Sequence, residues 1–208
     1  MLVFVVLLSV LAGLATAQEA TAATPVALPR LPQPATLQAE SLGGVAAQGD
    51  FAYVGHSNRL EIINVADPTA PVFVGRSVNL GEAVYDIAVR GSYAYTALGG
   101  SGFLKVLDIS NPVSPVVVGS YEARGSAESI ALAGNNVYMT DSVGLLIINV
   151  SDPSIPTLIG SYHFSPTASS TSVAVAGDYA YVTDLLASTM FILNIANPAT
   201  PTLVSQFR

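Results

Sequence analysis

The chain has 208 residues, of which 51% are hydrophobic and only 10% charged, with no cysteine and a formal net charge of −7. Without cysteine, these residues offer no disulfide, no thiolate metal ligand and no cysteine nucleophile. Because 14 acidic residues stand against 7 basic ones, the chain repels polyphosphate, and we expect no nucleic acid among its partners.

An apolar segment opens the sequence. Residues 2–17 carry no charge and end in Ala15-Thr16-Ala17, a pattern typical of signal-peptide cleavage. These 16 residues are fewer than the roughly 20 that cross a bilayer. No Lys or Arg precedes them, so residues 1–17 are interpreted as a signal peptide or, alternatively, an uncleaved N-terminal anchor that would be the only membrane contact.

A proline-rich stretch follows. Residues 18–34 are predicted to be a linker, since Thr24–Pro34 holds four prolines in eleven positions and such a sequence favours extended conformations. The folded part is therefore expected within residues 35–208, and the protein is expected to be extracytoplasmic, either secreted or at the cell surface.

Four units of about 43 residues repeat along the remainder, starting near residues 45, 87, 130 and 173. Their marker glycines are Gly49, Gly91, Gly134 and Gly177, at spacings of 42, 43 and 43. A period of this length with many β-branched residues indicates propeller blades or another β-repeat array. Helical repeats are excluded, because no unit contains a helical apolar stripe free of Gly or Pro.

Each unit divides into four short strands, which we call a to d in chain order. In the third unit the predicted strands are Ile130–Ala133, Val137–Thr140, Leu145–Val150 and Thr157–Tyr162. The third of these, LLIINV, is nearly continuous in apolar residues, which is typical of a strand covered on both faces. Four strands per unit is the composition of a propeller blade.

Strand c and the turn after it carry a family resemblance. The segments are LEIINVADPTAP, LKVLDISNPVSP, LLIINVSDPSIP and FILNIANPATP. They resemble LVIVD repeats, a bacterial and archaeal β-propeller repeat of exported proteins, over Val45–Phe207. The resemblance implies an extracytoplasmic propeller and brings no catalytic residues with it.

The expected fold is an all-β, propeller-like array of four four-stranded blades. Ala35–Leu42 resembles an additional d strand, and four full units with a spare strand do not close neatly. We therefore expect an open array, or a fragment of a larger propeller, whose exposed end blades promote self-association.

The loops of such an array lie on two rims. The a-to-b and c-to-d turns share one rim, where Asp67 and Asp152 alternate with Asn111 and Asn197, so these residues are interpreted as turn formers. The b-to-c and d-to-a loops share the other rim and differ between units, which favours binding there. Its candidate binding residues are His56, Arg59, Glu82, Asp86, Glu128, Asp141, His163 and Asp184.

No established chemical motif accompanies these residues. Asp141 and Asp184 occupy equivalent places, which we align with Gly55 and Ala97 in the first two units. Calcium-loop, GxSxG and HExxH motifs are missing, so we expect no metal ligands, no cofactor and no catalytic residues. The recurrent tyrosines of strand b, Tyr53, Tyr95, Tyr138 and Tyr181, are interpreted as packing between blades.

Three functions remain open at this point. The first is a non-enzymatic binding or cell-surface interaction module with a protein or glycan partner at the variable loops. The second is a hydrolase or lactonase-like enzyme with a site at the central channel, where Glu82, Asp86, Glu128 and His56 would have to lie close together. The third is a truncated structural fragment without autonomous function.

Overall fold

The computed structural model describes residues 41–100, 102–164 and 170–208, which form sixteen β-strands and no helix. The proposed signal peptide and linker lie outside the described residues, as does the predicted spare strand apart from Ser41 and Leu42. Leu42 begins the first strand of the first sheet and so belongs to strand a. No helix that could span a membrane is found in this described part of the chain.

The strands form four separate antiparallel sheets, each with its strands in sequence order. The first sheet comprises β1 (Leu42–Gln48), β2 (Phe51–His56), β3 (Arg59–Asn64) and β4 (Val72–Arg76). The second comprises β5 (Val84–Arg90), β6 (Tyr93–Leu98), β7 (Phe103–Asp108) and β8 (Val116–Glu122). The third comprises β9 (Ala127–Ala133), β10 (Asn136–Asp141), β11 (Gly144–Asn149) and β12 (Thr157–His163). The fourth comprises β13 (Ser170–Ala176), β14 (Tyr179–Asp184), β15 (Thr189–Asn194) and β16 (Thr202–Phe207).

The prediction of four four-stranded blades is confirmed. In the third sheet the predicted strands agree with the observed ones to within one residue at most ends, and strand a begins at Ala127 rather than Ile130. Every a-to-b hairpin turns at a marker glycine with positive φ, as at Gly134, where φ is 53°. Glycine adopts this conformation without the steric cost of a Cβ, which explains its regular recurrence.

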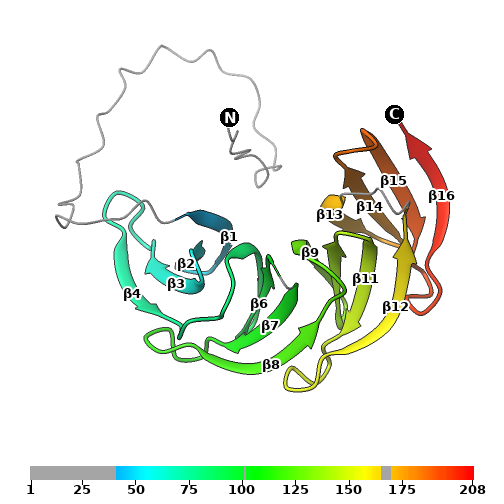
Figure 1. Cartoon of the computed structure of the whole chain (residues 1–208). Coiled ribbons are helices and arrows are strands. Elements are labelled where there is room, and N and C mark those ends of the chain that lie inside the picture. The colour runs from blue at the N-terminus through cyan, green and yellow to red at the C-terminus, as the bar shows by residue number, and fades with distance from the viewer. Residues whose placement is uncertain (1–40, 101, 165–169) are drawn as a thin grey trace, which may run out of the picture. The chain divides into compact units, whose positions relative to one another are not determined.

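The sheets follow one another in an arc (Figure 1), and each packs on the next in the chain. Strands β1, β5, β9 and β13 are the innermost, and consecutive members of this set contact one another. Three apolar cores fill the three junctions between consecutive sheets. Tyr53, Tyr95 and Tyr138 are each buried in one of these cores, which confirms their interpretation as packing residues. Tyr181 in the fourth sheet is only half-buried and belongs to none of the three cores.

The array is open. No strand of the first sheet pairs with a strand of the fourth within the described residues. Apolar side chains are consequently exposed on both end sheets, among them Val45 and Phe73 on the first and Val204 and Phe207 on the fourth.

The c-to-d turns are stabilised as their Asx residues predict. The Asp67 carboxylate accepts hydrogen bonds from the Thr69 amide, at 2.9 Å, and the Thr69 hydroxyl, at 2.7 Å. These donors, the hydroxyl first, lower the pKa of Asp67. Asn111 accepts a bond from the Val113 amide in the same way, at 3.2 Å, which explains why Asp and Asn interchange here.

Candidate binding rim

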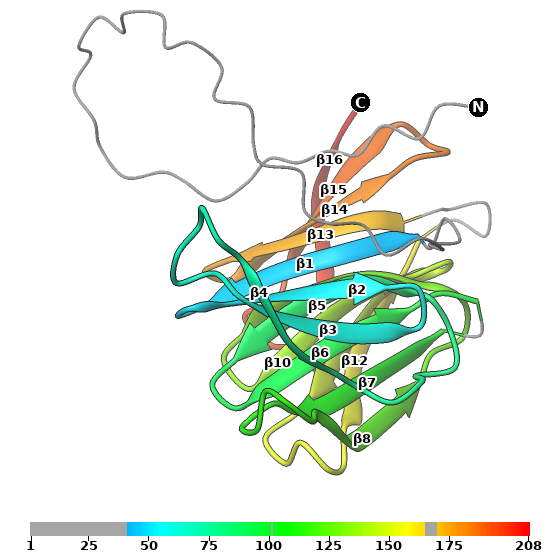
Figure 2. The same ribbon diagram turned by 90° about the vertical axis from the view of Figure 1, so that its left-hand side faces the viewer.

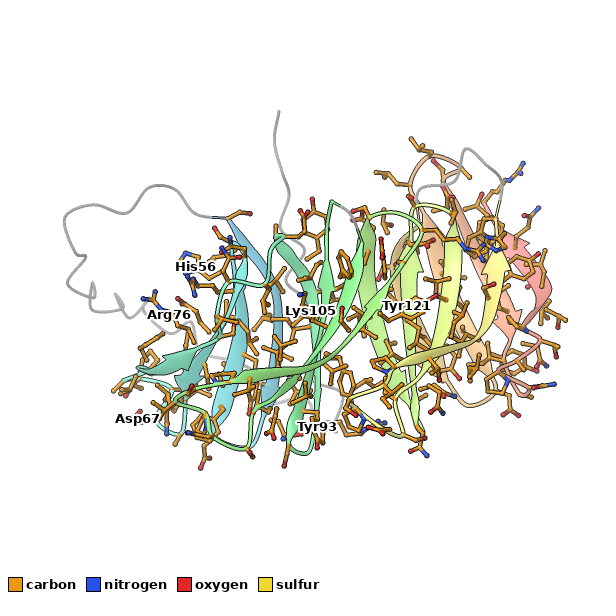
Figure 3. All side chains as sticks on the ribbon, turned by 60° about the horizontal axis from the view of Figure 1, so that its bottom comes forward. His56, Asp67, Arg76, Tyr93, Lys105 and Tyr121 are labelled. Atoms are coloured by element: carbon orange, nitrogen blue, oxygen red, sulfur yellow. The ribbon has the colours of Figure 1, made fainter. Side chains whose placement is uncertain are left out.

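The two expected rims are present. Figure 3 shows His56 and Asp67 at opposite ends of the first sheet. On the His56 side, the d-to-a loops donate backbone hydrogen bonds to the b-to-c turns, as from Ala123 to Gly102 at 2.7 Å and from Phe164 to Val143 at 3.1 Å. We call this side the variable rim; its described parts are residues 57–58, 77–83, 99–100, 102, 123–126, 142–143, 164 and 185–188.

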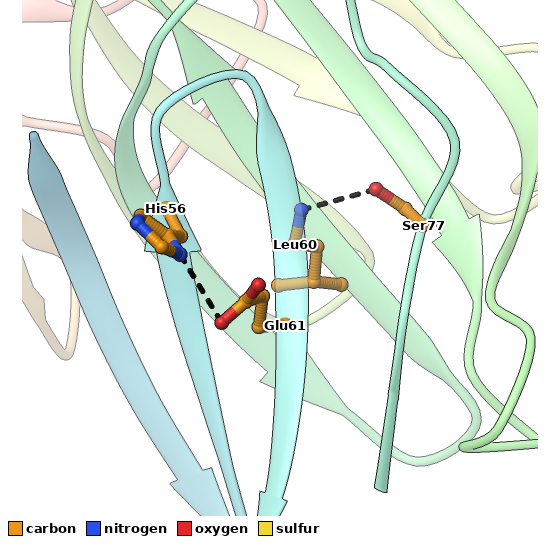
Figure 4. Close-up of polar contacts among 4 residues, drawn as sticks. All are labelled: His56, Leu60, Glu61 and Ser77. Atoms are coloured by element: carbon orange, nitrogen blue, oxygen red, sulfur yellow. Dashed lines mark hydrogen bonds and ion pairs between the residues drawn. The ribbon is translucent and has the colours of Figure 1, made fainter. Parts of the chain in front are cut away.

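Two of the candidate residues fasten the first sheet. His56 Nδ1 lies 3.3 Å from Glu61 Oε2 on the neighbouring strand (Figure 4). Arg59 donates from Nη1 to the backbone oxygen of Ser77 at 2.9 Å, and the Ser77 hydroxyl accepts a bond from the Leu60 amide at 3.0 Å. Arg59 therefore holds the start of the loop that leads to the second sheet.

Asp86 links the second sheet to the third. Its carboxylate accepts bonds from the Ser129 hydroxyl at 2.9 Å and from the Ile130 amide at 2.8 Å, both on β9. It also accepts a bond from the amide of Ile87 at 2.8 Å. Burial raises the pKa of Asp86 above its ordinary value, against the opposing effect of these hydrogen bonds.

Asp141 and Asp184 are buried at the ends of their b strands, with 0% and 3% of their surfaces exposed. The Asp141 Oδ1 atom accepts bonds from the amides of Val143 and Gly144, each at 2.9 Å. The Asp184 Oδ1 atom likewise accepts a bond from the Ala187 amide at 2.8 Å. Both carboxylates therefore stabilise the b-to-c turns that follow them. They are buried, whereas binding residues were expected to be exposed on the rim.

The strand pairing also corrects the alignment of these two residues. Each is the last residue of a b strand, and the corresponding residues in the first two sheets are His56 and Leu98. The alignment with Gly55 and Ala97 was wrong by one position. Counted from the marker glycine of each unit, all four residues lie at the same distance along the chain, which is the reference that gives the observed register.

The remaining candidates are spread along the rim. His163 is exposed, and its Nε2 atom lies 3.0 Å from Nη1 of the exposed Arg124. Glu82 is half-buried and lies against Gly100, where an added Cβ would come within 2.3 Å of its carboxylate. Glu128 is half-buried on β9. No group of three or more His, Cys, Asp or Glu side chains placed to hold a metal occurs in the part of the chain described above.

An apolar pair on the variable rim was missed by the sequence reasoning. Leu185 and Leu186 form the tip of the b-to-c turn in the fourth sheet, and 69% and 70% of their surfaces are exposed. The turn is fixed by the buried Asp184 carboxylate and by Ser188, whose φ is 49°. Two leucines between the polar ends of the loop DLLAST were the available signal, since a hairpin tip exposes its side chains.

The family model of the LVIVD repeat matches the chain four times, over residues 41–78, 81–123, 124–163 and 168–208. The chain belongs to the LVIVD-repeat family. Each match contains the four strands of one sheet, so one LVIVD repeat folds as one propeller-like blade in this protein. No curated protein matches the chain.

Proposed function

We propose that this LVIVD protein is an exported, non-enzymatic interaction module that binds another protein through its variable rim. The observation that carries the proposal is the exposed Leu185-Leu186 pair on a turn that a buried carboxylate holds in shape. The export signal predicted in residues 1–17 supports a role outside the cytoplasm.

The contrast between the rims favours the variable rim as the binding surface. The opposite rim repeats one Asx-Pro turn four times, with the same side-chain to backbone bonds at Asp67, Asn111, Asp152 and Asn197. The variable rim instead presents an arginine-histidine pair in one place and a leucine pair in another. A repeated scaffold with differing loops on one side is a common arrangement for recognition.

The leucine pair favours a protein partner over a glycan. Leucine side chains offer no hydrogen-bonding groups to sugar hydroxyls, but each contributes about 1.5–3 kcal/mol when it is transferred from water to an apolar pocket. Because Asp184 already fixes the turn, little conformational entropy is lost on binding.

The contacts of Asp86 bear on the hydrolase alternative. A raised pKa in a partly buried acid is typical of catalytic groups, and this observation is the one that favours an enzyme. However, its carboxylate is engaged by the Ser129 hydroxyl and two backbone amides, which is an arrangement for holding sheets together. If a metal-dependent hydrolase is correct, addition of EDTA should lower the melting temperature; the interaction module predicts no change.

A photo-reactive amino acid placed at position 186 of the full chain tests the proposal. In the cells that make the protein, illumination should yield an adduct of one defined mass that contains a second protein. The matched control is the same probe at Ile155, which is 65% exposed on the opposite rim and should yield no such adduct.

A second substitution keeps this test specific. Leu185→Ser should lower the adduct yield at position 186 by about tenfold, since one anchoring side chain is lost, whereas Ile155→Ser on the opposite rim should not. Equal labelling at positions 186 and 155, or adducts with lipid alone, would overturn the proposal.

A further inference from the structure

The d strands of the four sheets share one register, and one position in it holds glycine in three sheets and serine in the fourth. Each glycine pairs with a residue of the neighbouring strand c: Gly75 with Ile62, Gly119 with Val106 and Gly160 with Ile147. In the fourth sheet the same place, opposite Ile192, is taken by Ser205. In all four sheets an irregularity in the pairing adjoins this position.

The three glycines lie where the c-to-d turn of the next sheet comes close to the d strand. A Cβ added to Gly75 would lie 2.3 Å from the Val113 carbonyl oxygen, in the c-to-d turn of the second sheet. At Gly119 it would lie 2.1 Å from the Pro153 oxygen, and at Gly160 2.0 Å from the Pro198 oxygen. Real Cβ contacts are essentially never shorter than 3.0 Å, so any larger residue would separate the sheets.

Each sheet therefore has two different faces. We call the face toward the following sheet the trailing face and the face toward the preceding sheet the leading face. The trailing face supplies the glycine, and the leading face supplies the carbonyl of the Asx-Pro turn. Ser205 belongs to the trailing face of the fourth sheet, where its neighbour Val204 is 54% exposed.

Among the described residues no other sheet packs on the leading face of the first sheet, which is turned toward the viewer in Figure 2. Phe73 is 55% exposed there. The corresponding residues of the second and third sheets, Val117 and Leu158, instead pack on the sheets that precede them. Pro71 is exposed as well, whereas the corresponding Pro115 and Pro156 are buried. This face resembles the faces that dock at the internal junctions.

We propose that Ser205 prevents copies of this protein from stacking end to end. If the trailing face of one copy met the leading face of a second copy in the geometry of the internal junctions, the Ser205 Cβ would overlap the carbonyl of the Asp67-Pro68 turn. Two exposed apolar faces that fit each other in a head-to-tail manner would otherwise form open filaments. The expected self-association through the end blades is thus blocked in its most direct form.

The test is Ser205→Gly in the full chain, with Ser205→Ala as the matched control. The alanine variant loses the hydroxyl but keeps the Cβ, so it should associate no more than the natural protein. The glycine variant should form higher oligomers in sedimentation velocity at a concentration about tenfold lower or less. Adding Phe73→Asp to Ser205→Gly should reverse this association, because it places a charge on the leading face of the partner copy.

Disulfide trapping provides a second measurement of the geometry. The chain has no cysteine, so Thr69→Cys together with Val204→Cys introduces the only two thiols. A ladder of covalent oligomers should appear in the Ser205→Gly background and not with Ser205 retained. A folded Ser205→Gly variant with the mass of the natural protein and no ladder would overturn the proposal, as would equal association of the alanine variant.

Discussion

Asp86 on β5 accepts a hydrogen bond from the Ser129 hydroxyl on β9, at 2.9 Å, although 43 residues separate them in the chain. The Ser129 oxygen in turn lies 3.4 Å from the Val173 amide on β13. Polar contacts thus run along the innermost strands of the second, third and fourth sheets.

Removal of the Asp86 carboxylate should weaken the junction between the second and third sheets. In Asp86→Ala, the Ser129 hydroxyl and the Ile130 amide lose their acceptor, and we expect the free energy of unfolding to fall by about 2–4 kcal/mol. Urea denaturation measures this change. Glu122→Ala, at an exposed residue, is the control and should stay within about 0.5 kcal/mol; an equal effect of both substitutions would argue against the contact.

Asp86 should also make stability depend on pH. Its pKa is raised in the folded protein above the ordinary value of 3.8, so between these two values the folded state binds more protons than the unfolded state. The contribution of Asp86 is therefore fully present below about pH 4 and is lost as the pH rises through the folded pKa. The stability difference between the natural protein and Asp86→Asn, measured in urea from pH 4 to 7, should decrease with increasing pH. A difference that grows with pH would contradict the direction of the shift.

The glycines at the sheet junctions should not tolerate a methyl group. Gly119→Ala forces the Pro153 carbonyl away, and overpacking of this severity should cost about 3 kcal/mol or more. Gly119 and Ser205 occupy the same place in their d strands, but only Gly119 lies against a following sheet. Comparing the chemical denaturation of Gly119→Ala with that of Ser205→Ala therefore distinguishes the effect of the sheet junction from the effect of the strand position. The serine substitution should change stability by less than about 0.5 kcal/mol.

Asp141 should be needed for the fold of its turn. Asp141→Ala leaves the amides of Val143 and Gly144 without their acceptor in a buried place, at a cost of about 2–4 kcal/mol. For a protein of this size, that corresponds to a melting temperature lower by roughly 5–15 °C. Ser142→Ala changes the exposed next residue and should melt within about 2 °C of the natural protein. A melting temperature of Asp141→Ala equal to that control would remove the proposed role.

The sheets were predictable because each repeat encodes its own strands and turns locally. Glycine at the a-to-b turn and Asx-Pro at the c-to-d turn both act over a few residues, and both behave as their chemistry predicts. Tyr53, Tyr95 and Tyr138 were placed correctly because an aromatic residue that recurs with the repeat meets similar neighbours at each of the three junctions.

Asp86 was harder to assign, since two of its partners lie in another sheet. Ser129 gives no sign in sequence that its hydroxyl binds Asp86, because that contact depends on two strands from different repeats lying side by side. Asp141 and Asp184 follow the b strands as predicted from the sequence, a position typical of an exposed loop. Each carboxylate instead accepts amide bonds from the turn that follows it, and the sequence pattern alone does not show that this buries the side chain.

The openness of the array has a consequence for how the chain acquires its structure. The main contacts of each described sheet are with the sheets directly before and after it in sequence, so its packing does not depend on a distant repeat. In a closed ring, one apolar face of the first blade would stay exposed to water until the last blade had been synthesised. In this protein each repeat can complete the surface left by its predecessor as it emerges, which suits folding that proceeds from the N-terminus during synthesis or secretion.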